Sequence, residues 1–181
     1  MLLLAALACG TSTTPRALAD LTNPYLGPEL SGWLIGPISQ IASAEEIRSY
    51  LALRDDRQAA SFVERFWESR NPKPSRPNPL LQAFEEREAE ADRRFSEAGV
   101  LGRRTDRGTV WVVYGPPSRS GFESPPSPRD PPIELWVYDS GRPAGLDGKR
   151  PASQYRFAKR GDLTVTYVPR HGRLPQAGPP F

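Results

Sequence analysis

The first regular pattern of apolar and polar positions in the chain is helical and begins at residue 43. Ser43-Ala44-Glu45-Glu46 is a capping box, in which the serine side chain accepts from first-turn amides and the last glutamate reaches back. Asp55 or Asp56 can cap a second helix. Apolar residues recur at helical spacing behind both caps, which predicts that one face of each helix lies in the core. These residues are Ile47, Tyr50, Leu51, Ala59, Phe62, Val63, Phe66 and Trp67.

A third helix is predicted after the segment 70–77, whose prolines cannot continue a helix. Asn78 suits its cap, Pro79 its first residue and Gly99 its end. Its expected inner face comprises Leu81, Phe84, Ala91, Phe95 and Ala98. Its expected solvated face comprises Glu85, Glu86, Glu88, Glu90, Arg93 and Arg94, in which Glu90 and Arg94 have the spacing of an ion pair.

The apolar run Val110–Tyr114 consists of β-branched and aromatic residues, which favour a strand. Thr105, Asp106 and Gly108 suit a tight turn before it, and Gly115-Pro116-Pro117 ends it because proline cannot donate to a β-ladder. The run does not alternate between apolar and polar residues. We therefore expect residues 109–114 to form the central strand of a sheet, covered on both faces.

Further strands are predicted at 133–138, 154–158 and 163–168, with a Pro/Ser-rich loop at 118–132. Short connections that contain glycine favour an antiparallel meander. The predicted fold class is therefore α+β, with two to three N-terminal helices packed on a roughly four-stranded antiparallel sheet, in a domain that spans residues 43–168. The Pro-rich segment 169–181 is predicted to be a disordered tail.

The N-terminus carries an apolar run, residues 1–8, which ends in alanine directly before Cys9. Residues 1–9 resemble a lipoprotein signal, in which the cysteine is acylated and becomes the mature N-terminus. No Lys or Arg precedes the run, which a start codon placed too far downstream would explain. The alternatives are an ordinary export signal or an apolar terminus with a buried free cysteine. On the lipoprotein interpretation Cys9 is the lipid attachment site and the protein faces the periplasm from a membrane, with the outer membrane favoured.

Residues 10–42 are rich in Ser, Thr, Pro and Gly and are predicted to be a tether. Their apolar exception is a group formed by Trp33, Leu34, Ile35, Ile38 and Ile41. Two interpretations stay open for this group: it covers the domain, or it is an exposed patch for a partner.

The composition of the chain argues against several kinds of partner and catalytic site. The 24 basic and 21 acidic residues are interleaved rather than in blocks, so we expect no nucleic-acid partner. A single cysteine, Cys9, and a single histidine, His171, exclude an internal disulfide, a thiolate metal cluster and a Ser-His-Asp site in the core. P-loop, Rossmann and zinc patterns are absent from the sequence, so we expect no cofactor and no metal site.

Two blocks of the chain resemble the GWxTD-domain family of exported bacterial proteins. The first block comprises Phe66, Trp67, Arg70, Pro72 and Asn78, which are similar to the family's Phe-Trp-x-x-Arg-Asp-Pro-x-Pro followed by Asn. The second block comprises Thr105, Asp106, Arg107, Gly108, Tyr114, Gly115 and Pro116, which are similar to its Gly-Trp-x-Thr-Asp-Arg-Gly and Tyr-Gly-Pro-Pro. The resemblance covers about residues 43–168.

The chain departs from the family pattern at two positions. Arg103 stands where the name-giving tryptophan is expected, and Asn71 replaces the usual aspartate. If the tryptophan fills a pocket or binds a ligand in the family, this chain has lost that function. The resemblance implies an α+β domain located in the cell envelope, often on lipoproteins, and it supplies no catalytic residues.

Asp106 and Arg107 are the first candidates for a site, because an arginine fork can hold a carboxylate or phosphate bidentately. The alternative is structural: Asp106 caps a turn and Arg107 pairs with an acidic helix residue. A further hypothesis is that Arg70 and Asn78 fasten the proline turn to the loop 102–108. The loop 115–132 either presents a polyproline II segment to a partner or is a flexible hairpin insertion.

These observations favour a non-enzymatic envelope lipoprotein whose domain binds another envelope protein or a cell-wall component. The alternative is a carboxylate-dependent envelope hydrolase of the glycosidase type, with Asp106, Glu134 or Asp139 as candidate carboxylates. Their spacing in the sequence singles out no pair, so the sequence names no catalytic residue.

Overall fold

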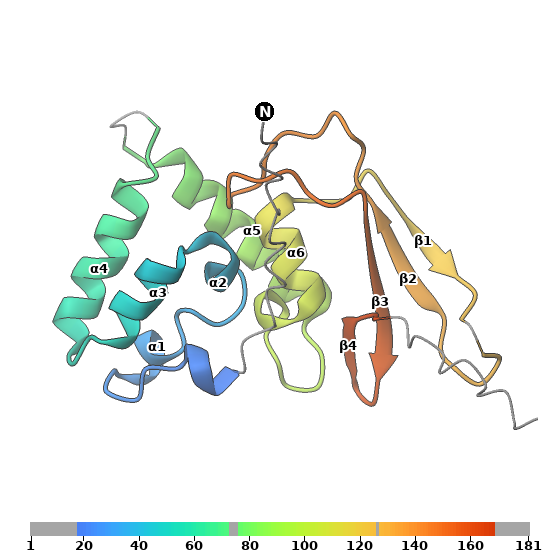
Figure 1. Ribbon diagram of the computed structural model, residues 1–181, viewed down its shortest axis with the longest axis horizontal. Helices are drawn as coiled ribbons and strands as arrows, with labels where there is room; N and C mark the ends of the chain where they lie inside the picture. Colours follow the sequence, from blue (N-terminus) through green and yellow to red (C-terminus); the bar gives the residue numbers. More distant parts are fainter. Residues whose placement is uncertain (1–17, 73–75, 126, 169–181) are drawn as a thin grey trace, which may run out of the picture.

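The computed structural model describes residues 18–72, 76–125 and 127–168, and in this part of the chain the helices lie on one side of a four-stranded antiparallel sheet (Figure 1). The predicted α+β fold class is confirmed. The predictions about the signal at residues 1–9, its lipid attachment site Cys9 and the tail 169–181 fall outside the described residues.

The helices are α1 (Pro28–Ser31), α2 (Ile38–Ile41), α3 (Ala44–Leu51), α4 (Asp56–Glu68), α5 (Pro79–Phe95) and α6 (Asp106–Tyr114), with 3-10 turns at Leu18–Leu21 and Gly102–Arg104. The strands are β1 (Arg119–Glu123), β2 (Ile133–Val137), β3 (Gln154–Arg160) and β4 (Leu163–Thr166). Within the described residues, no helix has both the length and the hydrophobicity that crossing a membrane requires.

The three helix starts predicted from caps are confirmed. Ser43 and Glu46 form the capping box of α3, and the Asp55 side chain accepts from the Gln58 N–H at the start of α4. The Asn78 side chain accepts from the Leu80 and Leu81 N–H groups, with Pro79 as the first residue of α5. The predicted end of α5 at Gly99 is wrong, because the helix ends at Phe95 and Gly99 lies in a following turn with φ +76°.

The central strand predicted at residues 109–114 is wrong, because this segment belongs to helix α6. Thr105 accepts from the Gly108 N–H as its N-cap, and Trp111, Val112 and Val113 are buried. Because α6 lies between α5 and the sheet, its apolar residues are covered on several sides (Figure 1). A short apolar run without alternation fits a buried helix as well as a buried strand, so burial overrode β-propensity here.

The sheet has the strand order β1-β2-β3-β4 with antiparallel neighbours, which confirms the predicted meander. Its first strand, β1, lies in the segment 118–132 that we expected to be a loop, so that expectation is wrong for residues 119–123. These residues lie between prolines, and pairing with β2 supplies the order that their composition does not indicate. On the inner face Trp136 packs 5.5 Å from Phe95, measured between ring centres.

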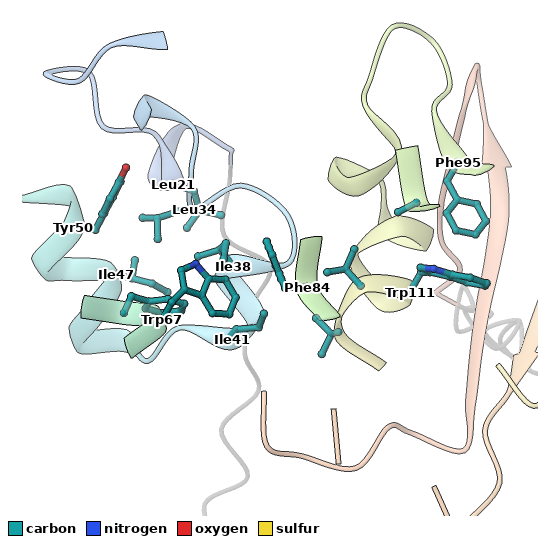
Figure 2. Packing of buried hydrophobic residues seen from close by; sticks show 14 of the residues in the cluster. Leu21, Leu34, Ile38, Ile41, Ile47, Tyr50, Trp67, Phe84, Phe95 and Trp111 are labelled. Atoms are coloured by element: carbon teal, nitrogen blue, oxygen red, sulfur yellow. The ribbon is translucent and has the colours of Figure 1, made fainter. Parts of the chain in front are cut away.

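The segment 18–42 is folded onto the helices, so the predicted tether is wrong for this described part. Leu34 and Ile38 are buried, and Figure 2 shows both beside Leu21, Trp67 and Phe84. The Asn23 amide donates to the carbonyl oxygens of Tyr50 and Leu53, which ties the segment to the end of α3. The structure therefore supports the interpretation that the apolar residues of this segment cover the domain.

Candidate functional site

The second motif block forms a junction between α5, α6 and the sheet, and glycines let its backbones touch. A Cβ placed on Gly102 would lie 1.9 Å from the Ala91 carbonyl oxygen of α5. A Cβ placed on Gly108 would lie 1.7 Å from the Gly102 carbonyl oxygen. Neither position has room for a side chain, so these glycines set the spacing of α5, the 3-10 turn and α6.

Thr105 and Asp106 attach the start of α6 to its surroundings. The buried Thr105 hydroxyl donates to the Gly102 carbonyl oxygen over 2.7 Å and accepts from the Gly108 N–H over 3.1 Å. The Asp106 Oδ2 atom accepts from the Thr166 N–H of β4 over 2.5 Å. Thr105 therefore has the capping role that the structural alternative expected of Asp106, and Asp106 holds an edge of the sheet against the helix.

Arg107 connects the two layers of the fold. Its Nη2 donates to Glu97 over 3.2 Å, its Nη1 donates to Glu134 over 3.1 Å, and its guanidinium carbon lies 5.3 Å from the centre of the Phe95 ring. Glu97 follows the end of α5 and Glu134 lies on β2. Arg107 therefore pairs with internal acidic residues, as the structural alternative expects, but neither of them is the helix residue that it named. These two carboxylates occupy the two terminal nitrogens of the guanidinium group.

The end of α6 is held in the same way by internal contacts. Gly115 has φ +75°, a left-handed conformation that favours glycine, and its carbonyl oxygen accepts from the Tyr138 hydroxyl over 2.8 Å. The Tyr114 hydroxyl donates to Asp147 over 2.9 Å. Burial raises the pKa of Tyr114 and of Tyr138, so both hydroxyls stay protonated donors. Pro116 is exposed beside them.

The first motif block lies at the turn between α4 and α5. Arg70 donates from Nη1 and Nη2 to the two carboxylate oxygens of Glu46, each over 2.8 Å, and its guanidinium carbon lies 3.7 Å from the centre of the Phe66 ring. The Asn78 amide donates to the Trp67 carbonyl oxygen over 2.7 Å, and Pro72 is exposed. The hypothesis that Arg70 and Asn78 fasten this turn to the loop 102–108 is therefore wrong, because α3 and α4 supply their partners.

Between α4 and α5 lies a groove of about 520 Å³, which we call the α4–α5 groove. Figure 1 shows the two helices diverging from the turn that joins them. Two residues of the first motif block, Trp67 and Asn78, contribute to its wall. The apolar lining residues are Leu30, Trp33, Ala60, Val63, Trp67, Leu81 and Phe84.

Every charged side chain that lines the α4–α5 groove is a glutamate, and these are Glu64, Glu68, Glu85 and Glu88. Burial raises the pKa of Glu88 to about 7, although Arg103 lies 3.0 Å away and opposes the shift. We expected Glu88 on the solvated face of α5, and this is wrong because only 18% of its side chain is exposed. Among the described residues, Glu64 and Glu85 form no ion pair.

The candidate carboxylates of a hydrolase do not line the α4–α5 groove. Asp106 and Glu134 have the internal partners described above, and Asp139 is exposed, 3.9 Å from Arg119. A second hollow of about 310 Å³, on the outer side of the sheet between β3, β4 and residues Pro125, Asp130 and Pro131, is not lined by these three carboxylates either. Among the described residues, no group of three or more His, Cys, Asp or Glu side chains could hold a metal ion.

The fold and the site define an α+β domain in which a helical hairpin with an acidic groove is joined, through a glycine-packed junction, to an antiparallel meander. The family model of the GWxTD domain matches residues 19–161, so the chain belongs to the GWxTD domain family. The match begins within the segment that is folded onto the helices. No curated protein and no solved structure matches the chain.

Arg103 occupies the place of the family's tryptophan and lies against α5. It forms ion pairs with Asp92 and Glu88, and its backbone N–H donates to Asp92 over 2.8 Å. Through Glu88 this arginine reaches the rim of the α4–α5 groove.

The groove was not predicted from the sequence, although the i,i+4 spacing of Glu64 and Glu68 beside Trp67 was a signal of one shared helix face.

Proposed function

We propose that this protein is a non-enzymatic binding domain of the cell envelope that docks another envelope protein in the α4–α5 groove. On this proposal an acyl chain on Cys9 holds the domain to a membrane, and the groove faces the periplasm. The observation that carries the proposal is an apolar groove whose charged lining residues are all glutamates.

The lining of the groove indicates the kind of partner. Trp33, Val63 and Leu81 are only partly buried, so their remaining apolar surface is available for contact. Grooves of this size, with an apolar floor and charges at the rim, suit the apolar face of an amphipathic helix. Glutamates at the rim favour lysine and arginine on the partner, because opposite charges attract and like charges are penalised. We therefore propose a basic amphipathic segment as the ligand.

The motif residues support this proposal through their position. Trp67 packs 4.8 Å from Phe84 between ring centres, and Asn78 joins the end of α4 to the start of α5. Both residues hold the angle at which the helices diverge, so they keep the groove open without a ligand. A preformed site loses less conformational entropy on binding.

Calorimetric titration with a designed peptide tests the groove. An amphipathic peptide of about 14 residues made of Leu and Lys, long enough to form a helix on the surface, is compared with a Leu and Glu peptide of equal length. We expect the basic peptide to bind. Ala60→Arg places a long cation in the groove and Glu64→Lys reverses a rim charge, so each should weaken binding at least tenfold.

Two matched variants serve as controls. Ala89→Arg and Glu86→Lys change exposed residues of α5 that do not line the groove, and both should bind the basic peptide as the wild type does. Equal binding by all four variants, or equal binding of the acidic peptide, would refute the proposed groove function.

The membrane anchor has its own test. Labelling cells with a palmitate analogue should mark the wild type, and Cys9→Ser should lose the label. A label retained by Cys9→Ser would exclude acylation at this residue. A photo-crosslinker at residue 60 should then capture an envelope protein that the same crosslinker at residue 89 does not capture.

A further inference from the structure

The two edges of the sheet differ in how their outward N–H groups are satisfied. On β4 these groups belong to Thr164 and Thr166, and each donates to a carboxylate: Thr164 to Glu97 over 2.8 Å and Thr166 to Asp106 over 2.5 Å. The β4 edge is therefore closed by side chains of the helical layer. Closing an exposed edge in this way prevents the addition of another strand.

The β1 edge has no such cover in the described part of the chain. The Tyr138 N–H donates to the Ser153 carbonyl oxygen, so the even-numbered residues of β2 bond toward β3 and its odd-numbered residues bond toward β1. In the β1–β2 register, Arg119, Gly121 and Glu123 face odd-numbered residues of β2. The N–H and C=O groups of Ser120 and Phe122 therefore point away from the sheet.

The side chains of β1 are also open to solvent. Phe122 is 77% exposed, the highest value among the large exposed apolar residues of the described chain. Figure 1 shows β1 at the margin of the sheet farthest from the helices. An exposed edge strand that presents free backbone groups and an aromatic side chain is a template for a further strand.

We propose that the β1 edge binds the β1 edge of a second copy of this chain, in an antiparallel pairing with its two-fold axis at Gly121. In this register Ser120 of each copy faces Phe122 of the other, so the outward groups exchange four main-chain hydrogen bonds. The two four-stranded sheets then form one continuous sheet. Phe122 of one copy lies diagonally across from Phe122 of the other, within reach of aromatic contact.

Charge complementarity identifies a second copy as the occupant. With the axis at Gly121, Arg119 of each copy lies opposite Glu123 of the other, on the outer face of the sheet, so the strand is complementary to itself. Within its own chain Arg119 lies 3.9 Å from Asp139, and Glu123 accepts from Arg156 over 2.8 and 3.0 Å, so each pair across the axis extends an existing ion pair into a network. A shift by two residues in either direction removes both charge pairs. The Ser118 N–H already donates to Val137 on its own chain, so a shift toward residue 118 also loses a main-chain bond.

A disulfide at the axis tests the pairing directly. Residues that face each other across a non-hydrogen-bonded pair have Cα atoms about 4.5 Å apart, within the range of a disulfide. A Cβ on Gly121 has no atom within 4 Å, so Gly121→Cys should fold. In the full chain with Cys9→Ser, Gly121→Cys should give a covalent dimer on oxidation with diamide, whereas the matched variant Gly141→Cys should give no covalent dimer.

Charge variants test the register. In sedimentation over a range of protein concentrations, Arg119→Glu and Glu123→Arg should each associate at least tenfold more weakly than the wild type, because like charges then face each other. A mixture of the two variants should associate again. Arg57→Glu changes the net charge as Arg119→Glu does, but on α4, and should associate like the wild type. Ala60→Arg should also leave association unchanged, which separates this inference from the groove.

Two outcomes would overturn the pairing. One is a wild-type protein that stays monomeric at every concentration together with no crosslink through residue 121. The other is association that Arg119→Glu and Glu123→Arg leave unchanged, which would place the contact between copies elsewhere.

Discussion

The two segments that carry the family motifs differ in what surrounds them. Residues 102–116 form a junction in which glycine backbones touch and in which Thr105, Asp106 and Arg107 bond to internal partners. In the other segment, Trp67, Glu68 and Asn78 instead border the open α4–α5 groove. Some motif residues therefore attach the layers of the fold to one another, and others shape a surface. A variant of the junction should therefore affect folding first, and a variant of the groove should affect binding first.

We expect the greatest loss of stability from a substitution in the junction. Gly108→Ala should destabilise the protein by about 3 kcal/mol or more, because its Cβ would overlap the Gly102 carbonyl oxygen and force α6 away from the 3-10 turn. Chemical denaturation measures this loss. Gly141→Ala is the control, since a Cβ there meets no atom within 4 Å. A Gly108→Ala variant as stable as the control would show that the junction is not tightly packed.

A smaller effect, dependent on pH, is expected where Arg103 of the junction meets the groove. Folded Glu88 has a pKa of about 7 against an ordinary value of 4.5, so between these pH values the folded state binds more protons than the unfolded state. The contribution of Glu88 to the free energy of unfolding is fully present below pH 4.5. It is lost as the pH rises through 7 and the buried carboxyl ionises. Glu88→Gln cannot ionise and should therefore be more stable than the wild type by about 1 to 2 kcal/mol at pH 8.

Thermal unfolding at two pH values measures the effect of Glu88→Gln. The gain at pH 8 should disappear at pH 4, where wild-type Glu88 is protonated in both states. The neighbouring charges are Arg103, Asp92, Glu85 and Arg104, which both proteins share. A variant that is less stable than the wild type at pH 8 would show that the ion pair with Arg103 outweighs the cost of burying the carboxylate.

The smallest effect concerns the ion pair beside the groove. The hydrogen bonds from Arg70 lower the pKa of Glu46 to about 2. A double-mutant cycle with Arg70→Ala and Glu46→Ala should give a coupling of about 1 kcal/mol at pH 7, as for a partly exposed bidentate pair. The coupling is complete above pH 4.5 and is lost as the pH falls toward 2. A cycle between Arg70 and Asp106 should give no coupling, and the opposite result would contradict the separation of the two segments.

Local signals in the sequence predicted the helix starts well. Ser43, Asp55 and Asn78 accept hydrogen bonds from N–H groups within three residues of themselves, so the interactions that define these starts involve only neighbouring residues. The antiparallel meander was also predictable, because short connections leave few other arrangements. The apolar run 110–114 was misread because its environment, rather than its own pattern, decides between helix and strand.

The candidate site was less accessible to prediction than the fold. Trp67 and Asn78 were identified through the family resemblance, but the glutamates of the groove come from two helices. Glu85 and Glu88 were assigned to the solvated face of α5, and Glu64 and Glu68 were assigned no role. The direction in which α4 and α5 diverge depends on the turn, on Trp67 against Phe84 and on the packing of residues 18–42. The spacing of residues along one helix does not indicate the angle between two helices.

The helix caps, the class of the fold and the family membership could be predicted from the sequence, because each depends on residues that are near one another in the chain or on a residue pattern. The helical state of residues 106–114, the place of residues 18–42 against the core and the difference between a closed and an open sheet edge depend on contacts between distant segments. Burial and hydrogen bonding between such segments outweigh local preferences of a few tenths of a kcal/mol, roughly, per residue.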